Sequence, residues 1–320
     1  KCIWKSYIKE HVFQYLPQNR DCHFGRFISN VSCNEKDREL AFVTAIGYLL
    51  NNYCHPSKGQ AVICYDEEIS DLRKPMGGTG KGLFANALKQ LREVTKIDGK
   101  KFEPNRFMYQ DITDATQLVW IDDIKADLSF STFHSVLTDG WSIEKKGKQQ
   151  FYIKPEDSPK VLFCSNTIIV GGGTTNKRRM FILEFGKYYS SKIRVGTEEP
   201  IKAEHGCVFF DKNDWNAEEW NKFYSYMMDC SCQYHCNGLQ IYNHRNVGVN
   251  SLRQVAGEEF TTWITARDFQ LGMTYLSAEE YSKFLEVSAC TSEDVKPRDF
   301  TSYLRAYADS KGLLVDFRRS

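Results

Sequence analysis

The sequence predicts an α/β protein built around a covered, largely parallel sheet. Short apolar runs with strand character alternate along the chain with segments of helical periodicity. The three clearest runs lie at residues 61–65, 117–121 and 161–164, and polar residues follow each of them. Strands that are apolar throughout and separated by helices are typical of parallel sheets buried on both faces.

The composition is that of a packed protein of enzyme size. The chain has 320 residues, of which 42% are hydrophobic, 26% charged and 14% aromatic. These fractions argue against a disordered, collagen-like or coiled-coil chain. The apolar runs are too short or too interrupted to span a bilayer, and no secretory signal is visible. We therefore expect a cytoplasmic protein with no membrane partner. The chain begins at Lys1 rather than Met, which leaves an upstream domain open.

The cysteines indicate the redox compartment of the protein, and the charge balance indicates where a polyanion could bind. An odd number of cysteines, 11, is scattered over the chain, which favours a reducing compartment over a disulfide framework. Cys230, Cys232, His235 and Cys236 crowd the end of a predicted helix, so buried cysteines are expected there rather than zinc. The net charge of +1 provides no global positive field, and any polyanion site must be local.

The periodicity divides the chain into three predicted parts. Residues 1–58 have helical spacing and are expected to form an N-terminal helical domain. Residues 59–242 contain the strands, a further strand at 180–185 and a helix at 216–236. Residues 243–320 contain helical segments and a terminal strand at 313–317, which predicts a winged-helix-like unit.

A glycine-rich loop with a lysine separates the first strand from an unbroken helix at residues 83–91. Backbone N–H groups of such a loop and the helix N-terminus converge on phosphate oxygens, and Lys81 adds a positive charge. The default ligand is ATP. The residues predicted to hold it are Gly77, Gly78, Thr79, Gly80, Lys81, Gly82 and Leu83.

The loop departs from the pattern G-x-x-x-x-G-K-[ST] at two positions. Pro75 stands at the first glycine, and Gly82 replaces the hydroxyl residue that normally binds magnesium. Thr79 or a water molecule would have to supply the missing ligand. A glycine-rich turn with a solvated lysine is the alternative interpretation.

Polar residues that suit nucleotide hydrolysis follow the next two strands. Asp122 and Asp123 can bind a nucleotide-bound Mg²⁺ and orient an attacking water. Asn166 carries an amide that can contact both the γ-phosphate and that water. Solvated turns are the alternative for each, because Asp and Asn favour turns for local reasons.

Two further groups of candidate functional residues are basic. Arg178 and Arg179 carry planar guanidinium groups that suit phosphate oxygens, or else lie on a solvated strand edge. Residues 141–153 read as a hairpin with a basic glycine turn. Its lysines and neighbouring aromatic side chains combine charge with stacking faces, as single-strand binders do, although surface lysines are commonly only solvated. The hairpin residues predicted to bind DNA are Lys145, Lys146 and Lys148.

In this order along the chain, these motifs resemble a superfamily 3 helicase. The resemblance is to primase-helicase proteins of bacteriophages and mobile elements related to poxvirus-type helicases, and it covers residues 60–239. It implies a P-loop AAA+ (superfamily 3) motor that forms a ring, usually a hexamer, in a bacterial host's cytoplasm. Such a ring hydrolyses ATP with Mg²⁺ at subunit interfaces and pulls single-stranded DNA from a fork through its pore. An oligomerisation role for residues 1–58 and an associated primase are further expectations.

The resemblance also implies a role for each site residue. Lys81 would contact the β- and γ-phosphates, Asp122 would bind the metal, and Asp123 would polarise water. Asn166 would sense the γ-phosphate, and Arg178 or Arg179 would reach a neighbouring subunit's ATP. The hairpin lysines would line the pore.

Two other functions and a second DNA path stay open. One is a P-loop NTPase that packages or loads nucleic acid without unwinding it. The other is a replication-initiator ring that binds ATP as a structural clamp, which the missing hydroxyl at Gly82 favours. If the hairpin does not bind DNA, Arg318 and Arg319 in the C-terminal tail are the next candidates.

Overall fold

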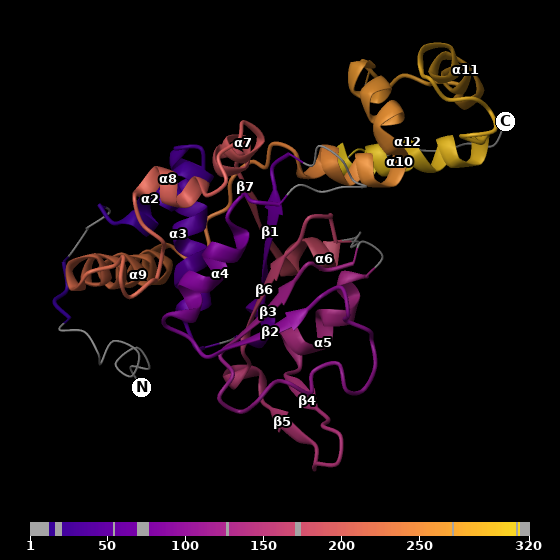
Figure 1. Cartoon of the computed structure of the whole chain (residues 1–320). Coiled ribbons are helices and arrows are strands. Elements are labelled where there is room, and N and C mark those ends of the chain that lie inside the picture. The colour runs from indigo at the N-terminus through magenta and orange to yellow at the C-terminus, as the bar shows by residue number, and fades with distance from the viewer. Residues whose placement is uncertain are drawn as a thin grey trace. The chain divides into compact units, whose positions relative to one another are not determined.

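The computed structural model of the chain describes residues 13–16, 21–53, 55–68, 77–125, 128–169, 174–270, 272–311 and 313. The chain divides into two compact units, residues 1–243 and 244–320 (Figure 1). The first unit contains the central sheet and all of the predicted nucleotide-site residues.

A five-stranded sheet organises the first unit, with the strand order β2-β3-β6-β1-β7. Every neighbouring pair in it is parallel, which confirms the predicted α/β class. The three central strands are buried along almost their whole length, because both faces are covered. The strands are β1 (Ala61–Asp66), β2 (Val94–Asp98), β3 (Leu118–Asp122), β6 (Lys160–Cys164) and β7 (Met180–Phe185).

The strand order brings three chain segments to one edge of the sheet. Strand β6 lies between β1 and β3, and all three run in the same direction. Their carboxyl ends, at Asp66, Asp122 and Cys164, therefore meet at the same edge. Loops beyond this edge of an open parallel sheet are the usual place for a ligand site.

Helices cover one face of the sheet with a large hydrophobic core (Figure 1). The alternate strand residues Val62 and Leu162 face this core. Because α2 and α3 belong to the segment expected as an N-terminal domain, that segment shares one core with the sheet. The helices that contribute to the core include α2 (His23–Val31), α3 (Lys36–Leu50), α4 (Lys81–Lys89) and α9 (Ala217–Asn237). The helical spacing at residues 3–15 falls almost entirely outside the described residues.

The other face of the sheet is covered by aromatic residues from a short helical segment. Phe163 of β6 packs against Phe133, with ring centroids 4.8 Å apart, and against Phe130 at 6.2 Å. These rings come from the 3₁₀ turn η2 (Phe130–Phe133), which leads into α5 (His134–Thr138). The remaining short elements are η1 (Pro56–Lys58), η3 (Pro155–Asp157), α6 (Thr174–Arg179), α7 (Tyr188–Arg194) and α8 (Pro200–His205).

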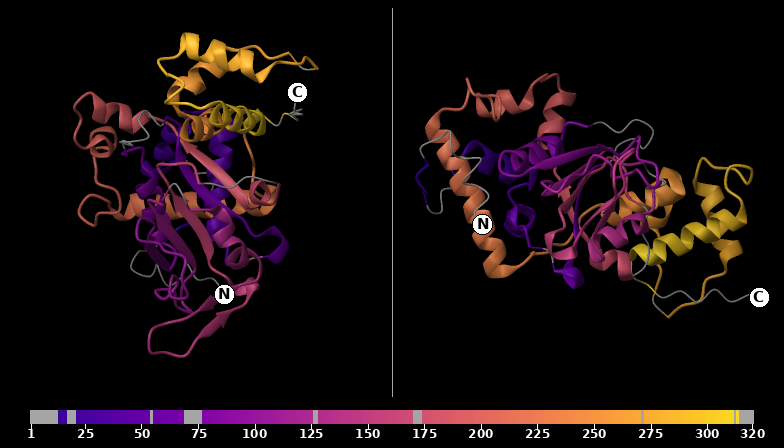
Figure 2. Two further views of the ribbon diagram at one scale, coloured as in Figure 1. Left: turned by 90° about the vertical axis from the view of Figure 1, so that its right-hand side faces the viewer. Right: turned by 90° about the horizontal axis from the view of Figure 1, so that it is seen from below.

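The predicted basic hairpin is present. Strands β4 (Trp141–Ile143) and β5 (Phe151–Ile153) pair antiparallel, and Gly147 in the turn has φ 69°. Glycine adopts this left-handed conformation more readily than residues with a Cβ. In two perpendicular views the hairpin projects away from the central sheet (Figures 1 and 2).

The second unit is a small helical assembly around Phe260, Trp263, Phe284 and Phe300. Its helices are α10 (Val247–Ala266), which is kinked at Gly257, α11 (Ser277–Val287) and α12 (Pro297–Lys311). The described part of this unit contains no strand. Apart from Leu313, the expected terminal strand and the two tail arginines lie outside the described residues, and the winged-helix-like unit stays a prediction.

The expectation of buried cysteines at the end of α9 is correct for Cys230 and wrong for Cys232 and Cys236, which are exposed. None of the described helices is long and apolar enough to cross a membrane.

Helices α3 and α9 approach so closely that one glycine is required between them. A Cβ added to Gly47 would lie 2.2 Å from the carbonyl oxygen of Cys230 and 2.5 Å from Cβ of Tyr234. We predict that Gly47→Ala lowers the free energy of unfolding by about 2 kcal/mol, because overpacked cores must shift backbone. Urea denaturation measures this loss.

A matched control uses a helical glycine with open space around it. Nothing lies within 4 Å of a Cβ added to Gly82 in α4. Gly82→Ala should leave stability unchanged or raise it by roughly 0.5–1 kcal/mol, as alanine favours helix. Equal losses in both variants would contradict the close-packing explanation.

Candidate nucleotide-binding site

The glycine loop joins the carboxyl edge of the sheet to the N-terminus of α4. Gly80 caps the helix with φ 106°, and an added Cβ would lie 2.6 Å from the ring of Phe27. Glycine is therefore needed here for both backbone conformation and space. The first N–H groups of a helix lack acceptors within it, so those at Lys81, Gly82 and Leu83 can bind an anion.

A chain of side-chain hydrogen bonds joins three of the predicted site residues. Lys81 Nζ donates to Asn166 Oδ1 at 2.9 Å. Asn166 Nδ2 donates in turn to Asp123 Oδ1 at 2.8 Å. These residues follow β1, β6 and β3, and they meet because β6 lies between the other two strands. The structure thus brings Lys81, Asn166 and Asp123 together in one cluster.

The two predicted acids each pair with a lysine that sequence analysis missed. Asp122 Oδ2 lies 2.8 Å from Lys96 Nζ, and Asp123 Oδ2 lies 2.9 Å from Lys100 Nζ. The hydrogen bond that Lys100 donates to Asp123 raises the pKa of Lys100 above its ordinary value. Asp123 has φ 55°, and its N–H donates to the Cys164 carbonyl at 2.8 Å, which fixes it against β6.

Asp66 is a second acid in contact with this cluster, through Lys81, and was not predicted as a site residue. It is the last residue of β1 and is 4% exposed. Its Oδ1 accepts a hydrogen bond from Thr79 Oγ1 at 2.5 Å and forms an ion pair with Lys81 Nζ. The available signal was its place at the end of the strand that precedes the glycine loop, equivalent to that of Asp122 on β3.

The residues that surround the glycine loop fit a magnesium–nucleotide complex. Mg²⁺ is bound in such sites through one or two carboxylates together with phosphate oxygens and water. Asp122 and Asp123, at the carboxyl end of β3, can supply carboxylates, and Thr79 supplies a hydroxyl whose hydrogen is donated to Asp66. Gly82 supplies no side-chain ligand, so the carboxylates and the nucleotide would have to complete the coordination.

The arginine pair lies at the opposite edge of the sheet. Arg178 and Arg179 precede β7, which is parallel to β1 with Met180 opposite Ala61. Six strand residues, about 20 Å at 3.3 Å each, therefore separate the pair from the glycine loop of the same chain. Arg179 is buried and donates to the Gly59 carbonyl at 3.0 Å, whereas Arg178 is exposed.

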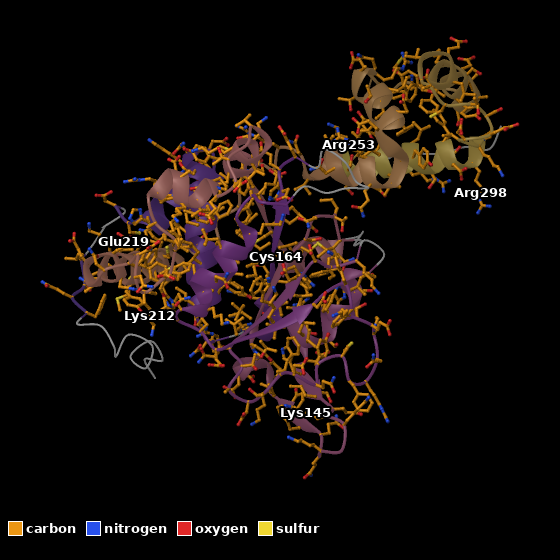
Figure 3. All side chains as sticks on the ribbon, in the orientation of Figure 1. Lys145, Cys164, Lys212, Glu219, Arg253 and Arg298 are labelled. Carbon is orange, nitrogen blue, oxygen red and sulfur yellow. The ribbon has the colours of Figure 1, made fainter. Side chains whose placement is uncertain are left out.

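The hairpin lysines lie apart from the nucleotide site, as the labelled positions of Lys145 and Cys164 show (Figure 3). Lys145 Nζ is 5.5 Å from the ring of Phe151, and Lys146 Nζ is 5.9 Å from that of Phe107. Lys148 is exposed. The predicted combination of charge and aromatic faces is present on the hairpin in Lys145 and Phe151, and Phe107 from outside the hairpin lies near Lys146.

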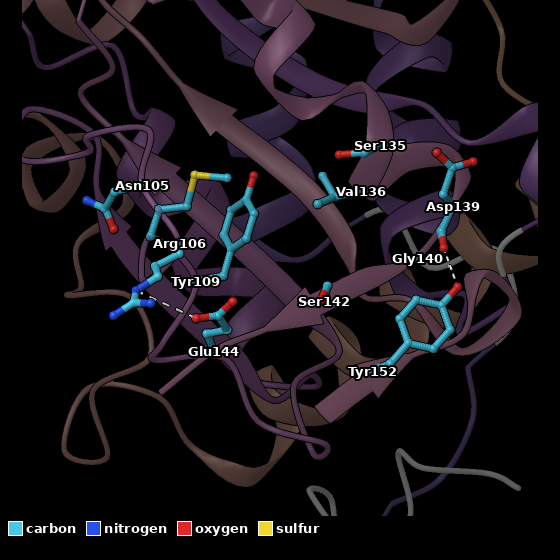
Figure 4. A pocket seen from close by; sticks show the side chains of 11 residues that line it. Asn105, Arg106, Tyr109, Ser135, Val136, Asp139, Gly140, Ser142, Glu144 and Tyr152 are labelled. Atoms are coloured by element: carbon cyan, nitrogen blue, oxygen red, sulfur yellow. Dashed lines mark hydrogen bonds and ion pairs between the residues drawn. The ribbon is translucent and has the colours of Figure 1, made fainter. Parts of the chain in front are cut away.

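A cavity of about 360 Å³ lies at the root of the hairpin (Figure 4). The Tyr152 hydroxyl donates to the Asp139 carbonyl across it, and Arg106 approaches Glu144 at 3.8 Å. These contacts tie the hairpin strands to α5 and to the turn around residue 106. They support the base of the hairpin while its basic tip projects.

Comparison of the chain with protein-family models finds one match. The model of a family of unknown function (DUF5906) matches residues 74–179, which include the glycine loop, both acids at the end of β3, the hairpin, Asn166 and the arginine pair. A search of curated proteins finds no match.

Solved structures show only distant similarity. An apo form of the NrS-1 C terminal region is 13% identical, with 94% of this chain and 69% of that one covered and a TM-score of 0.49. A second apo structure of that region has the same identity and coverage and a TM-score of 0.44. A JCV helicase bound to a small molecule is 10% identical, covering 65% and 60%, with a TM-score of 0.33. Such values are too low to transfer a function.

Proposed function

We propose that this chain is an ATP-dependent DNA helicase or translocase of superfamily 3 type that serves the replication of a phage or mobile element. It hydrolyses ATP with Mg²⁺ at the interfaces of a ring of identical subunits and moves along single-stranded or forked DNA. The observation that supports this most is the cluster of Lys81, Asn166 and Asp123 at the carboxyl edge of a parallel sheet. The motor class, the host-cell cytoplasm and a primase partner belong to the proposal through the family resemblance.

Each cluster residue has a distinct chemical task in this proposal. The N-terminus of α4 and Lys81 bind the phosphate chain. Bound Mg²⁺ neutralises phosphate charge and helps to orient the triphosphate for in-line attack. Asp122 binds the metal, and Asp123 orients the attacking water and accepts its proton. Asn166 forms hydrogen bonds with both Lys81 and Asp123.

The basic hairpin is the proposed DNA contact. Lys145, Lys146 and Lys148 sit on a projecting element, and rings lie within 6 Å of the first two. A ring of identical subunits would multiply these charges around a pore. A strong local field can then coexist with a net charge of +1 per chain.

One observation favours a second candidate. Gly82 leaves the metal without its usual hydroxyl ligand, which suits a replication-initiator ring that holds ATP as a clamp. A P-loop NTPase that packages or loads DNA without unwinding would use the same site. Steady-state ATP hydrolysis with and without single-stranded DNA separates the clamp from the motors, and a forked-DNA unwinding assay separates the helicase from the loader.

We predict that Lys81→Ala lowers ATP turnover at least a hundredfold, because it removes the lysine that reaches the phosphates. Phosphate release measures the rate. Lys89→Ala, an exposed lysine at the other end of α4, is the control and should keep wild-type turnover. Near wild-type turnover in Lys81→Ala would rule out the ATPase assignment.

The arginine pair provides a test of action between subunits. We expect exposed Arg178 to act on a neighbour's ATP, so Arg178→Ala subunits mixed with Lys81→Ala subunits should regain activity that neither has alone. Arg179→Ala should instead lower thermal stability, because Arg179 is buried against Gly59. A failure of well-formed mixed rings to recover activity would contradict a trans role.

The hairpin is tested by the salt dependence of binding. Replacing Lys145, Lys146 and Lys148 with alanine should flatten the slope of log K against log salt by about 0.7 per lost phosphate contact. Basal ATP hydrolysis should survive, because the hairpin is separate from the nucleotide site, whereas DNA stimulation and unwinding should be lost. Fluorescence anisotropy with single-stranded DNA measures the slope.

A matched triple variant replaces three exposed lysines elsewhere on the first unit: Lys89, Lys202 and Lys212. It changes the net charge equally and should leave the slope near that of the wild type. An unchanged slope in the hairpin variant would move the DNA path, and the C-terminal tail would be the next region to test.

A further inference from the structure

Asp66 holds both polar side chains of the glycine loop. Residues 77–82 include only two residues with polar side chains, Thr79 and Lys81. Asp66 Oδ1 accepts the Thr79 hydroxyl at 2.5 Å and forms an ion pair with Lys81 Nζ. The groups that would meet phosphate oxygens are therefore already bound to an anion of the protein.

Burial makes this ion pair costly to break. Asp66, Thr79 and Lys81 are 4%, 4% and 9% exposed. A buried charge is costly unless a partner compensates it, and removing one partner leaves the other uncompensated. Asp66 is the carboxylate that compensates Lys81.

Strand β7 fixes the backbone of Asp66 and of the residue after it. Asp66 pairs with Phe185 in the register of β1 with β7. The next residue, Glu67, donates its N–H to the Phe185 carbonyl at 2.9 Å and forms a buried ion pair with Arg38 at 3.1 Å. A carboxylate held in this way stays beside Lys81 when a ligand arrives, so it is the flexible lysine that must move.

From these contacts we propose that Asp66 is an internal competitor of the nucleotide and sets its affinity. It occupies Lys81 in the empty site and repels the phosphate chain in the filled one. The proposal rests on the proposed function, since it concerns the same phosphate site. Repulsion between like charges is much stronger in a buried site than in water, so one carboxylate is enough to change affinity. A moderate affinity would let a cyclic ATPase release its product at each turnover.

The test is the variant Asp66→Asn, which removes the charge and keeps an oxygen that can accept from Thr79 and Lys81. ATP, ADP and AMP are titrated in Mg²⁺, without DNA, as competitors of a fluorescent ATP analogue. We expect ATP to bind about tenfold tighter or more, ADP to gain less, and AMP to gain little. This order follows from the number of phosphates that reach Lys81.

The control Glu68→Gln removes the negative charge of an exposed side chain two residues after Asp66. Glu68 is exposed and pairs with Lys187 at 2.6 Å. Its nucleotide affinities should stay within twofold of the wild type. Thr79→Val, which keeps the Asp66 charge, should likewise not tighten ATP binding.

The outcomes separate this inference from the proposed function. Wild-type protein that fails to bind ATP would overturn the proposed function. Wild-type protein that binds ATP, together with a folded Asp66→Asn variant that binds it equally or more weakly, would overturn the role of Asp66 alone. An equal gain for AMP would do the same. If thermal unfolding shows that Asp66→Asn does not fold, Asp66→Ser tests the same charge loss with a smaller side chain.

Discussion

The candidate site depends on the position of β6 between β1 and β3. Because the three strands are parallel, their carboxyl ends meet at one edge, and residues more than forty positions apart in sequence come within hydrogen-bonding distance. The amide of Asn166 can bridge Lys81 and Asp123 because β6 lies between β1 and β3. Covering helices bury both faces, so the strands cannot slip without moving apolar side chains out of the core.

Charge balance is the second property of the site. Each acid at the sheet edge pairs with a lysine: Asp66 with Lys81, Asp122 with Lys96, and Asp123 with Lys100. The pairs differ in burial, since Lys81 is nearly enclosed whereas Lys96 and Lys100 are largely exposed. The outer lysines can exchange their partners for water at little cost, but the inner one cannot. The inner pair therefore has the greater influence on what the site binds.

The sequence predicted the features that rest on local patterns. The buried strands β1, β3 and β6 are continuous apolar runs, and the hairpin has a glycine turn between β-prone segments. Strand β2 was missed because only Ile97 of its five residues is buried, so it has no apolar run, and with it Lys96 and Lys100 were missed. Asp66 was not predicted, since its contact with Lys81 exists only after the chain has folded. The distance between the arginine pair and the loop likewise depends on strand direction.

The pairing of β1 also determines when the site can form. Its two neighbours in the sheet, β6 and β7, begin at residues 160 and 180, about a hundred positions further along the chain. Closing loops of this length loses entropy before the new contacts compensate for it, so sheets of this topology assemble slowly. During synthesis, a chain that ends before β6 leaves both edges of β1 unpaired and exposed to other chains. The segment that carries the phosphate loop is thus among the last parts of the first unit to be protected.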